Sequence, residues 1–89
     1  MRTLARTNQF KRDYKKAKRR GHDISKLLEI VTRLARGEKL EARYRDHALG
    51  GEYPDCRECH IEPDWLLIYR LTEEELVLIR MGSHSDLFE

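Results

Sequence analysis

Long apolar runs and export signals are missing from this 89-residue chain. No stretch approaches the roughly 20 apolar residues that a membrane-spanning helix requires. The opening segment, MRTLARTNQFKRDYKK, contains no hydrophobic core of the kind that directs secretion. We therefore expect a cytoplasmic protein with no membrane partner. Internal repeats and low-complexity linkers are also missing, which together with the length predicts a single domain over residues 1–89.

Cysteine is scarce, and both cysteines fall in one short stretch, CRECH, at residues 56–60. Cys-x-x-Cys-His is the spacing of c-type haem attachment, and cysteine pairs near histidine also bind zinc. A strand, however, places residues three apart on opposite faces, so these two thiols could not grip one metal ion. We expect reduced thiols and no cofactor or metal, with Cys59 a small buried residue and Cys56 an incidental surface residue.

Acidic residues are almost absent from the first 20 positions, which contain nine Lys or Arg and only Asp13. Residues 46–89 have the opposite balance, with three basic and eleven acidic side chains. A concentrated basic segment attracts nucleic acid because phosphate neutralisation releases counterions, although a solvated helix face would look the same. The candidate RNA-binding residues of this segment are Lys11, Lys15, Lys16, Lys18 and Arg19.

Two amphipathic helices are predicted in the first half of the chain. The first begins at Thr7 or Asn8, which can cap a helix, and ends at Gly21. The second is capped by Asp23 and stopped by Gly37. Its apolar positions follow the spacing of one buried stripe and are Ile24, Leu27, Leu28, Val31, Leu34 and Ala35.

The second half of the chain changes to the period of strands. Residues 56–61 alternate, and residues 65–71 and 76–81 are dense in apolar side chains. With a short edge strand at residues 2–7, the predicted order is β-α-α-β-β-β. This is an α+β fold in which two N-terminal helices pack on an antiparallel sheet. Part of the other face is left for a partner.

Three of the four histidines lie at the ends of predicted elements. His47 precedes a loop, His60 ends a strand and His84 follows the last strand, while Asp64 lies in a turn. If these groups converge, they can move protons between a ribose 2′-OH, its adjacent phosphate and the leaving 5′-oxygen without a metal. A lone histidine is more often structural, and His22 is expected only to be solvated. The pattern is compatible with a ribonuclease.

The string DHALGG…CRECHIEPDWLLIYRL…LIRMGSHSDLF resembles the YafQ branch of the RelE/ParE toxin superfamily. The likeness runs over nearly the whole chain and implies a RelE-like fold. It also implies a bacterial type II toxin that cleaves mRNA in the ribosomal A site, with adenosine-rich codons preferred. A cognate antitoxin encoded beside it is the implied partner, together with the ribosome and mRNA.

The resemblance also assigns roles to individual residues. The implied catalytic positions are His47, His60, Asp64 and His84. We expect His47 to act as base and His84 as acid, with the other two orienting and stabilising. Phe88 would position a base of the RNA, and Arg80 would be either a phosphate contact or a salt bridge at the rim.

Two other functions remain open from the sequence. The ParE branch shares the fold and inhibits DNA gyrase by binding, and a small zinc module would use the cysteines. Titratable groups at the histidine positions disfavour a pure inhibitor, because binding alone does not require them. Trp65 and Tyr69 are expected in the core, since large aromatic side chains in strands usually bury their area.

Overall fold

A mixed five-stranded sheet forms the centre of the computed structural model, which describes residues 1–88. The strand order is β1-β5-β4-β3-β2. The strands are β1 (Thr3–Arg6), β2 (His47–Ala48), β3 (Arg57–Glu62), β4 (Trp65–Leu71) and β5 (Glu75–Gly82). β3, β4 and β5 form the predicted antiparallel meander, and the α+β class is confirmed. The sheet is not antiparallel throughout, because the edge strand β1 pairs with β5 in parallel.

Both predicted N-terminal helices are present. The helices are α1 (Asn8–Arg19), α2 (Ile24–Ala35), the 3-10 turn η1 (Ala42–Tyr44) and α3 (His84–Phe88). Thr7 caps α1 by accepting a hydrogen bond from the Phe10 amide, and Asp23 caps α2 in the same way. Gly21 and Gly37 follow α1 and α2 with φ of 82° and 79°, the left-handed conformation in which glycine avoids a Cβ clash.

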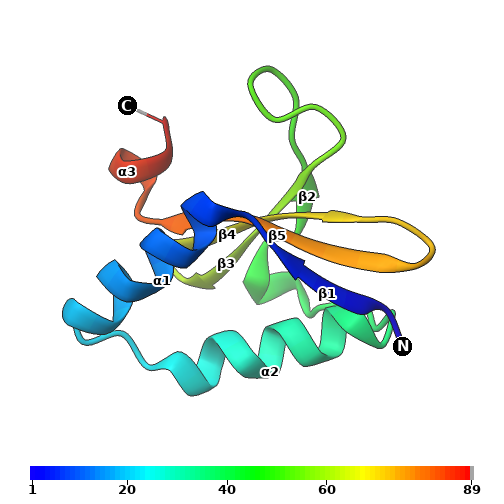
Figure 1. The fold of residues 1–89 in the computed structure, drawn as a ribbon, viewed down its shortest axis with the longest axis horizontal. Helices are drawn as coiled ribbons and strands as arrows, with labels where there is room; N and C mark the ends of the chain where they lie inside the picture. The colour runs from blue at the N-terminus through cyan, green and yellow to red at the C-terminus, as the bar shows by residue number, and fades with distance from the viewer. Residues whose placement is uncertain (89) are drawn as a thin grey trace.

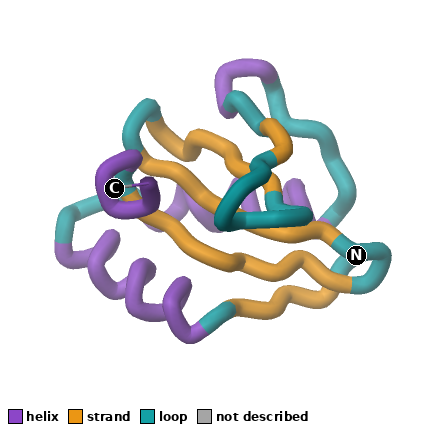
Figure 2. The backbone as a smooth tube through the Cα atoms, turned by 90° about the horizontal axis from the view of Figure 1, so that it is seen from above, coloured by secondary structure: helices purple, strands orange, loops and turns teal. Residues whose placement is uncertain are grey.

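Alternate residues of β4 point to the two faces of the sheet. Trp65 and Tyr69 are fully buried in the main core beside α1 and α2, as predicted. Leu66 and Ile68 are buried in a smaller cluster on the opposite face. Figure 1 shows α2 on one side of the sheet, with α3 and the loop at residues 49–56 on the other. Seen from above, α3 lies over one end of the strands (Figure 2).

β2, η1 and α3 were not predicted from the sequence. The start of α3 has a local signal, because Ser83 and Asp86 form a reciprocal capping box. The Ser83 hydroxyl accepts from the Asp86 amide at 3.1 Å, and an Asp86 carboxylate oxygen accepts from the Ser83 amide at 2.9 Å. Of the helices within residues 1–88, none combines the length and apolar character that a membrane span needs.

The prediction for Cys56 as a surface residue is wrong. Cys56 is 7% exposed and packs with Leu66, Ile68 and Leu87 in the smaller cluster. Cys59 is fully buried in the main core, so the two thiols lie on opposite faces of the sheet as the strand period predicts. Burial raises the pKa of the Cys59 thiol to about 12 and also raises the pKa of Cys56. Thiols of this kind stay protonated at neutral pH.

His22 is also more than a solvated joint residue. Its ring stacks on Trp65 with 4.3 Å between ring centroids and 14° between ring planes. Its Nδ1 lies 3.5 Å from a carboxylate oxygen of Glu62. The ring therefore covers the edge of the core where α1 turns into α2.

Candidate active site

The predicted catalytic histidines of β2 and β3 lie on the sheet face opposite α1 and α2. Residues directly opposite each other on neighbouring strands share a face. His47 lies opposite Glu58, and His60 lies opposite Leu66 of the smaller cluster. The sheet register thus holds both imidazoles on the face that the two long helices leave uncovered.

Glu58 joins these two histidines, although it was not predicted as a site residue from the sequence. Its Oε1 lies 3.5 Å from Nε2 of His47 and 3.4 Å from Nε2 of His60. Glu58 is only 3% exposed, and its Oε2 has no hydrogen-bond partner among the described residues. Burial of a carboxylate is costly without opposite charge or hydrogen bonds, so this placement points to function. The signal in the sequence was Glu58-x-His60 in a strand, which puts both side chains on one face.

Backbone carbonyl groups set the orientation of both rings. Nδ1 of His47 lies 2.7 Å from the carbonyl oxygen of Arg45, and Nδ1 of His60 lies 3.3 Å from that of Pro63. A carbonyl oxygen only accepts hydrogen bonds, so Nδ1 of each ring carries the proton. The lone pair of each neutral ring is then on Nε2, beside Glu58.

His84 and Asp64 form a second pair at the N-terminus of α3. An Asp64 carboxylate oxygen accepts a hydrogen bond from the His84 amide at 2.9 Å. The His84 ring packs against Phe88 at 5.1 Å between centroids, and the Tyr53 and Phe88 rings form a T-shaped pair at 6.2 Å. His84 is exposed and Phe88 is 40% exposed, so both aromatic surfaces are open to a ligand.

The four predicted catalytic residues therefore form two pairs. Within residues 1–88, no hydrogen bond, ion pair or ring contact joins the His47–His60 pair to the Asp64–His84 pair. The register places His60, Leu66 and Gly82 side by side across three strands, a span of about 10 Å at the usual strand spacing. His84 follows Gly82 by two residues. The two pairs consequently flank a stretch of sheet surface that a substrate could bridge.

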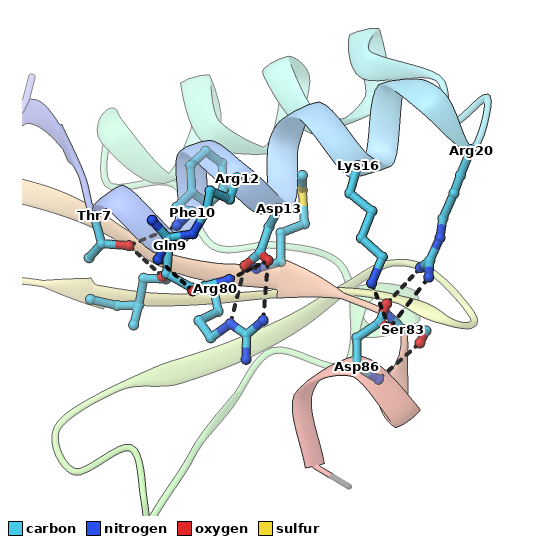
Figure 3. A network of polar contacts seen from close by, with 12 residues as sticks. Thr7, Gln9, Phe10, Arg12, Asp13, Lys16, Arg20, Arg80, Ser83 and Asp86 are labelled. Atoms are coloured by element: carbon cyan, nitrogen blue, oxygen red, sulfur yellow. Dashed lines mark hydrogen bonds and ion pairs between the residues drawn. The ribbon is translucent and has the colours of Figure 1, made fainter.

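Arg80 forms a salt bridge, which is one of the two alternatives expected from the sequence. Its Nε and Nη2 donate to the Asp13 carboxylate at 3.2 and 3.1 Å (Figure 3). The same carboxylate accepts from the Met81 amide at 3.1 Å, beyond the end of β1 where this edge of β5 lacks a strand neighbour. Hydrogen bonding to Asp13 is the main cause that raises the pKa of Arg80. The arginine is one-quarter exposed and keeps some access to a ligand.

The cationic side chains of α1 and of Arg20, the residue that follows it, divide into two groups. Lys16 and Arg20 form ion pairs with Asp86 of α3 at 3.3 and 2.6 Å (Figure 3). Lys16, one of the predicted RNA-binding residues, therefore already has a partner within the protein. The other candidates are all exposed, and they are Lys11, Lys15, Lys18 and Arg19. The basic surface of α1 therefore adjoins the site through α3.

Comparison with protein families settles which toxin branch the chain resembles. The family described as "Bacterial toxin of type II toxin-antitoxin system, YafQ" matches residues 2–89. The chain belongs to the YafQ family of toxins.

Known YafQ proteins are similar over most of their length. The mRNA interferase toxin YafQ of Escherichia coli K12 is 40% identical, over 98% of this chain and 96% of the relative. The crystal structure of YafQ from E. coli BL21(DE3) has a TM-score of 0.94 at 38% identity, with 100% of both chains covered. The toxin in the E. coli DinJ–YafQ complex has a TM-score of 0.93 at 39% identity, again over 100% of both chains.

Proposed function

We propose that this YafQ-family toxin cleaves mRNA in the ribosomal A site through the two residue pairs described above. The protein is a toxin of a type II toxin–antitoxin system and an endoribonuclease, in line with its relatives named mRNA interferase. It has a cognate antitoxin, in line with the E. coli toxin, which is found in a toxin–antitoxin complex with DinJ. Because the proposed substrate is mRNA on ribosomes, the proposal includes a cytoplasmic location for the protein. One observation carries the mechanism, namely that Glu58 gathers His47 and His60 on a face shared with His84.

The base side of the reaction belongs to His47. With Nδ1–H donating to the Arg45 carbonyl, Nε2 of His47 can accept the proton of the ribose 2′-OH. The 2′-oxygen then attacks the adjacent phosphorus. The imidazolium that forms is stabilised by the Glu58 carboxylate 3.5 Å away. His60, on the other side of Glu58, orients this group and faces the charge that develops on the phosphate.

The acid side belongs to His84. As an imidazolium it donates its proton to the 5′-oxygen as the bond from that oxygen to phosphorus breaks. Asp64 holds the first residue of α3 in place by accepting the His84 amide hydrogen bond. The exposed ring of Phe88 next to His84 offers a stacking surface for the nucleotide that leaves. No metal takes part in these steps.

A sulfur-substituted leaving group tests the roles of acid and base. mRNA with a 5′-bridging sulfur at the scissile phosphate needs no proton on the leaving group, because a thiolate departs unaided. We expect His84→Ala to lose about 100-fold or more in the rate of cleavage of normal mRNA on programmed ribosomes. With the sulfur substrate, the cleavage rate of the His84→Ala variant should return most of the way to that of the unmodified toxin. The rate of the His47→Ala variant should stay low. Equal behaviour of the two variants on both substrates would contradict the assignment, and intact mRNA with the unmodified toxin would contradict the function.

A further inference from the structure

A groove of about 480 Å³ opens beside His60, at the junction of α2, η1 and β3. It exists because β2 is short and pairs only with Arg57 and Glu58. Beyond Glu58, the same edge of β3 has no strand neighbour, and η1 lies beside it instead. The groove therefore begins where the His47–Glu58–His60 cluster ends.

Two arginines give this groove its charge. Arg43 and Arg45 line it, and neither has a carboxylate partner within residues 1–88. The Arg43 guanidinium lies over the Tyr44 ring, 4.7 Å from its centroid, and donates a hydrogen bond to the Tyr44 hydroxyl at 2.8 Å. The result is a planar cation held over an aromatic ring, with a second cation two residues away.

The acids of the groove are distributed unevenly. Glu62 is bound by Lys26 at 2.8 Å and is approached by His22, so its charge is compensated. Glu29, the other acid that lines the groove, is exposed on α2 and has no cationic partner among the described residues. A polyanion would consequently lie against η1, away from α2.

We propose that this groove binds the nucleotide on the 5′ side of the scissile phosphate, through phosphate contacts from Arg43 and Arg45. This inference rests on the proposed nuclease function. The 2′-OH that attacks belongs to the 5′ nucleotide, and its base is His47, which Arg45 orients through its carbonyl group. The strand upstream of that ribose must leave the site on the His47–His60 side, and the groove opens there. The guanidinium of Arg43, backed by Tyr44, offers a flat surface for a base.

Crosslinking on the ribosome tests the position of the strand. The probe is an mRNA programmed in 70S ribosomes, with a 2′-O-methyl group that blocks cleavage and a 4-thiouridine on one side of the scissile phosphate. We expect the 5′ probe to crosslink to the peptide that contains residues 43–45, and the 3′ probe to crosslink near α3. Crosslinks of the 5′ probe only to ribosomal RNA, or only to other parts of the toxin, would overturn the proposal.

A kinetic comparison gives an independent measure. The double variant R43Q/R45Q should raise the toxin concentration for half-maximal cleavage about tenfold or more, with the maximal rate within twofold of the unmodified toxin. The slope of log affinity against log salt should fall by about 1.4, the value for two phosphate contacts on a single strand. Arg36→Gln, an exposed charge just after the end of α2 and outside the basic N-terminal segment, is the matched control and should change neither value. If the unmodified toxin cleaves mRNA but R43Q/R45Q matches it in both values, the groove assignment fails while the nuclease function stands.

Discussion

At the scale of single residues, Glu58 does most to organise the site. Its carboxylate is buried, contacts two imidazoles with one oxygen and leaves the other oxygen without a protein partner among residues 1–88. Such a group costs free energy unless its neighbours carry positive charge. It therefore suits a step in which His47 becomes an imidazolium. Asp13 is a buried carboxylate with a structural role, since it binds Arg80 and the Met81 amide away from the histidines.

Substitution of Glu58 by Gln tests its role as a positioning residue. We expect E58Q to lower the cleavage rate roughly 10- to 100-fold, because the amide cannot stabilise the charged form of His47. A leaving group with 5′-sulfur should not restore the rate, since the loss is on the base side. Glu58→Asp should restore part of it.

The control for this substitution is Glu73→Gln, an exposed acid in the turn between β4 and β5. It should leave the rate unchanged. Rescue of E58Q by the sulfur substrate would contradict the base-side role. An unfolded variant is recognised by loss of the circular dichroism signal and of antitoxin binding.

At the scale of elements, α3 is a five-residue helix that depends on contacts with its surroundings. Its links are the hydrogen bond from the His84 amide to the Asp64 carboxylate, the Ser83–Asp86 capping box, and the ion pairs of Asp86 with Lys16 and Arg20. Gly82 allows this approach, because a Cβ there would lie 2.9 Å from Cβ of Asp86. The helix that carries His84 is thus placed by polar contacts at its first turn.

Asp86→Asn should reveal this dependence in the pH profile of stability. Hydrogen bonding, first of all to Arg20, holds the pKa of Asp86 well below its ordinary value of 3.8. A carboxylate with a lowered folded-state pKa stabilises the fold above its unfolded pKa, and this contribution is lost as the pH falls further. We expect D86N to be less stable than the unmodified protein by about 1 kcal/mol at pH 7. The difference should shrink below about pH 4.

Chemical denaturation at several pH values measures this difference, and mRNA cleavage should fall in parallel at pH 7 because His84 and Phe88 lose their placement. Asp55→Asn is the matched control, as Asp55 is exposed in the loop before β3 with φ of 62°, which asparagine tolerates. A constant difference from pH 3 to pH 7 would argue against the ion pairs as its source.

At the scale of the whole molecule, positive charge is concentrated in the N-terminal helix and negative charge in the second half of the chain. The exposed cations of α1 adjoin α3, and the acidic side chains are concentrated in residues 46–89. Long-range attraction to ribosomal RNA would orient the toxin with α1 toward the phosphates.

Neutralisation of the exposed α1 cations tests this orientation. A variant with glutamine at Lys11, Lys15, Lys18 and Arg19 should bind ribosomes about tenfold more weakly at 0.1 M salt and show a shallower salt dependence. Cleavage at saturating toxin should be nearly unchanged, because these side chains lie outside the two catalytic pairs. Sedimentation with 70S ribosomes over a series of salt concentrations measures the affinity and its salt dependence. A variant with the unmodified salt slope would show that α1 does not face RNA.

Periodicity made both long helices and the three meander strands predictable. It also placed Cys56 and Cys59 on different faces, because side-chain direction in a strand depends only on spacing. The cap at Thr7 and the stops at Gly21 and Gly37 were local signals as well. The resemblance to YafQ proteins, read from the sequence, is confirmed by the family match.

The tertiary structure alone decided how distant segments meet. β1 joins β5 in parallel, and Asp13 reaches Arg80 across 67 positions of sequence. Leu49 and Tyr53 pack against the cluster that contains Cys56. The burial of Glu58 between two histidines likewise depends on the pairing of β2 with β3. Spacing fixes which way a side chain points from its own element, whereas its neighbours depend on packing between elements far apart in the chain.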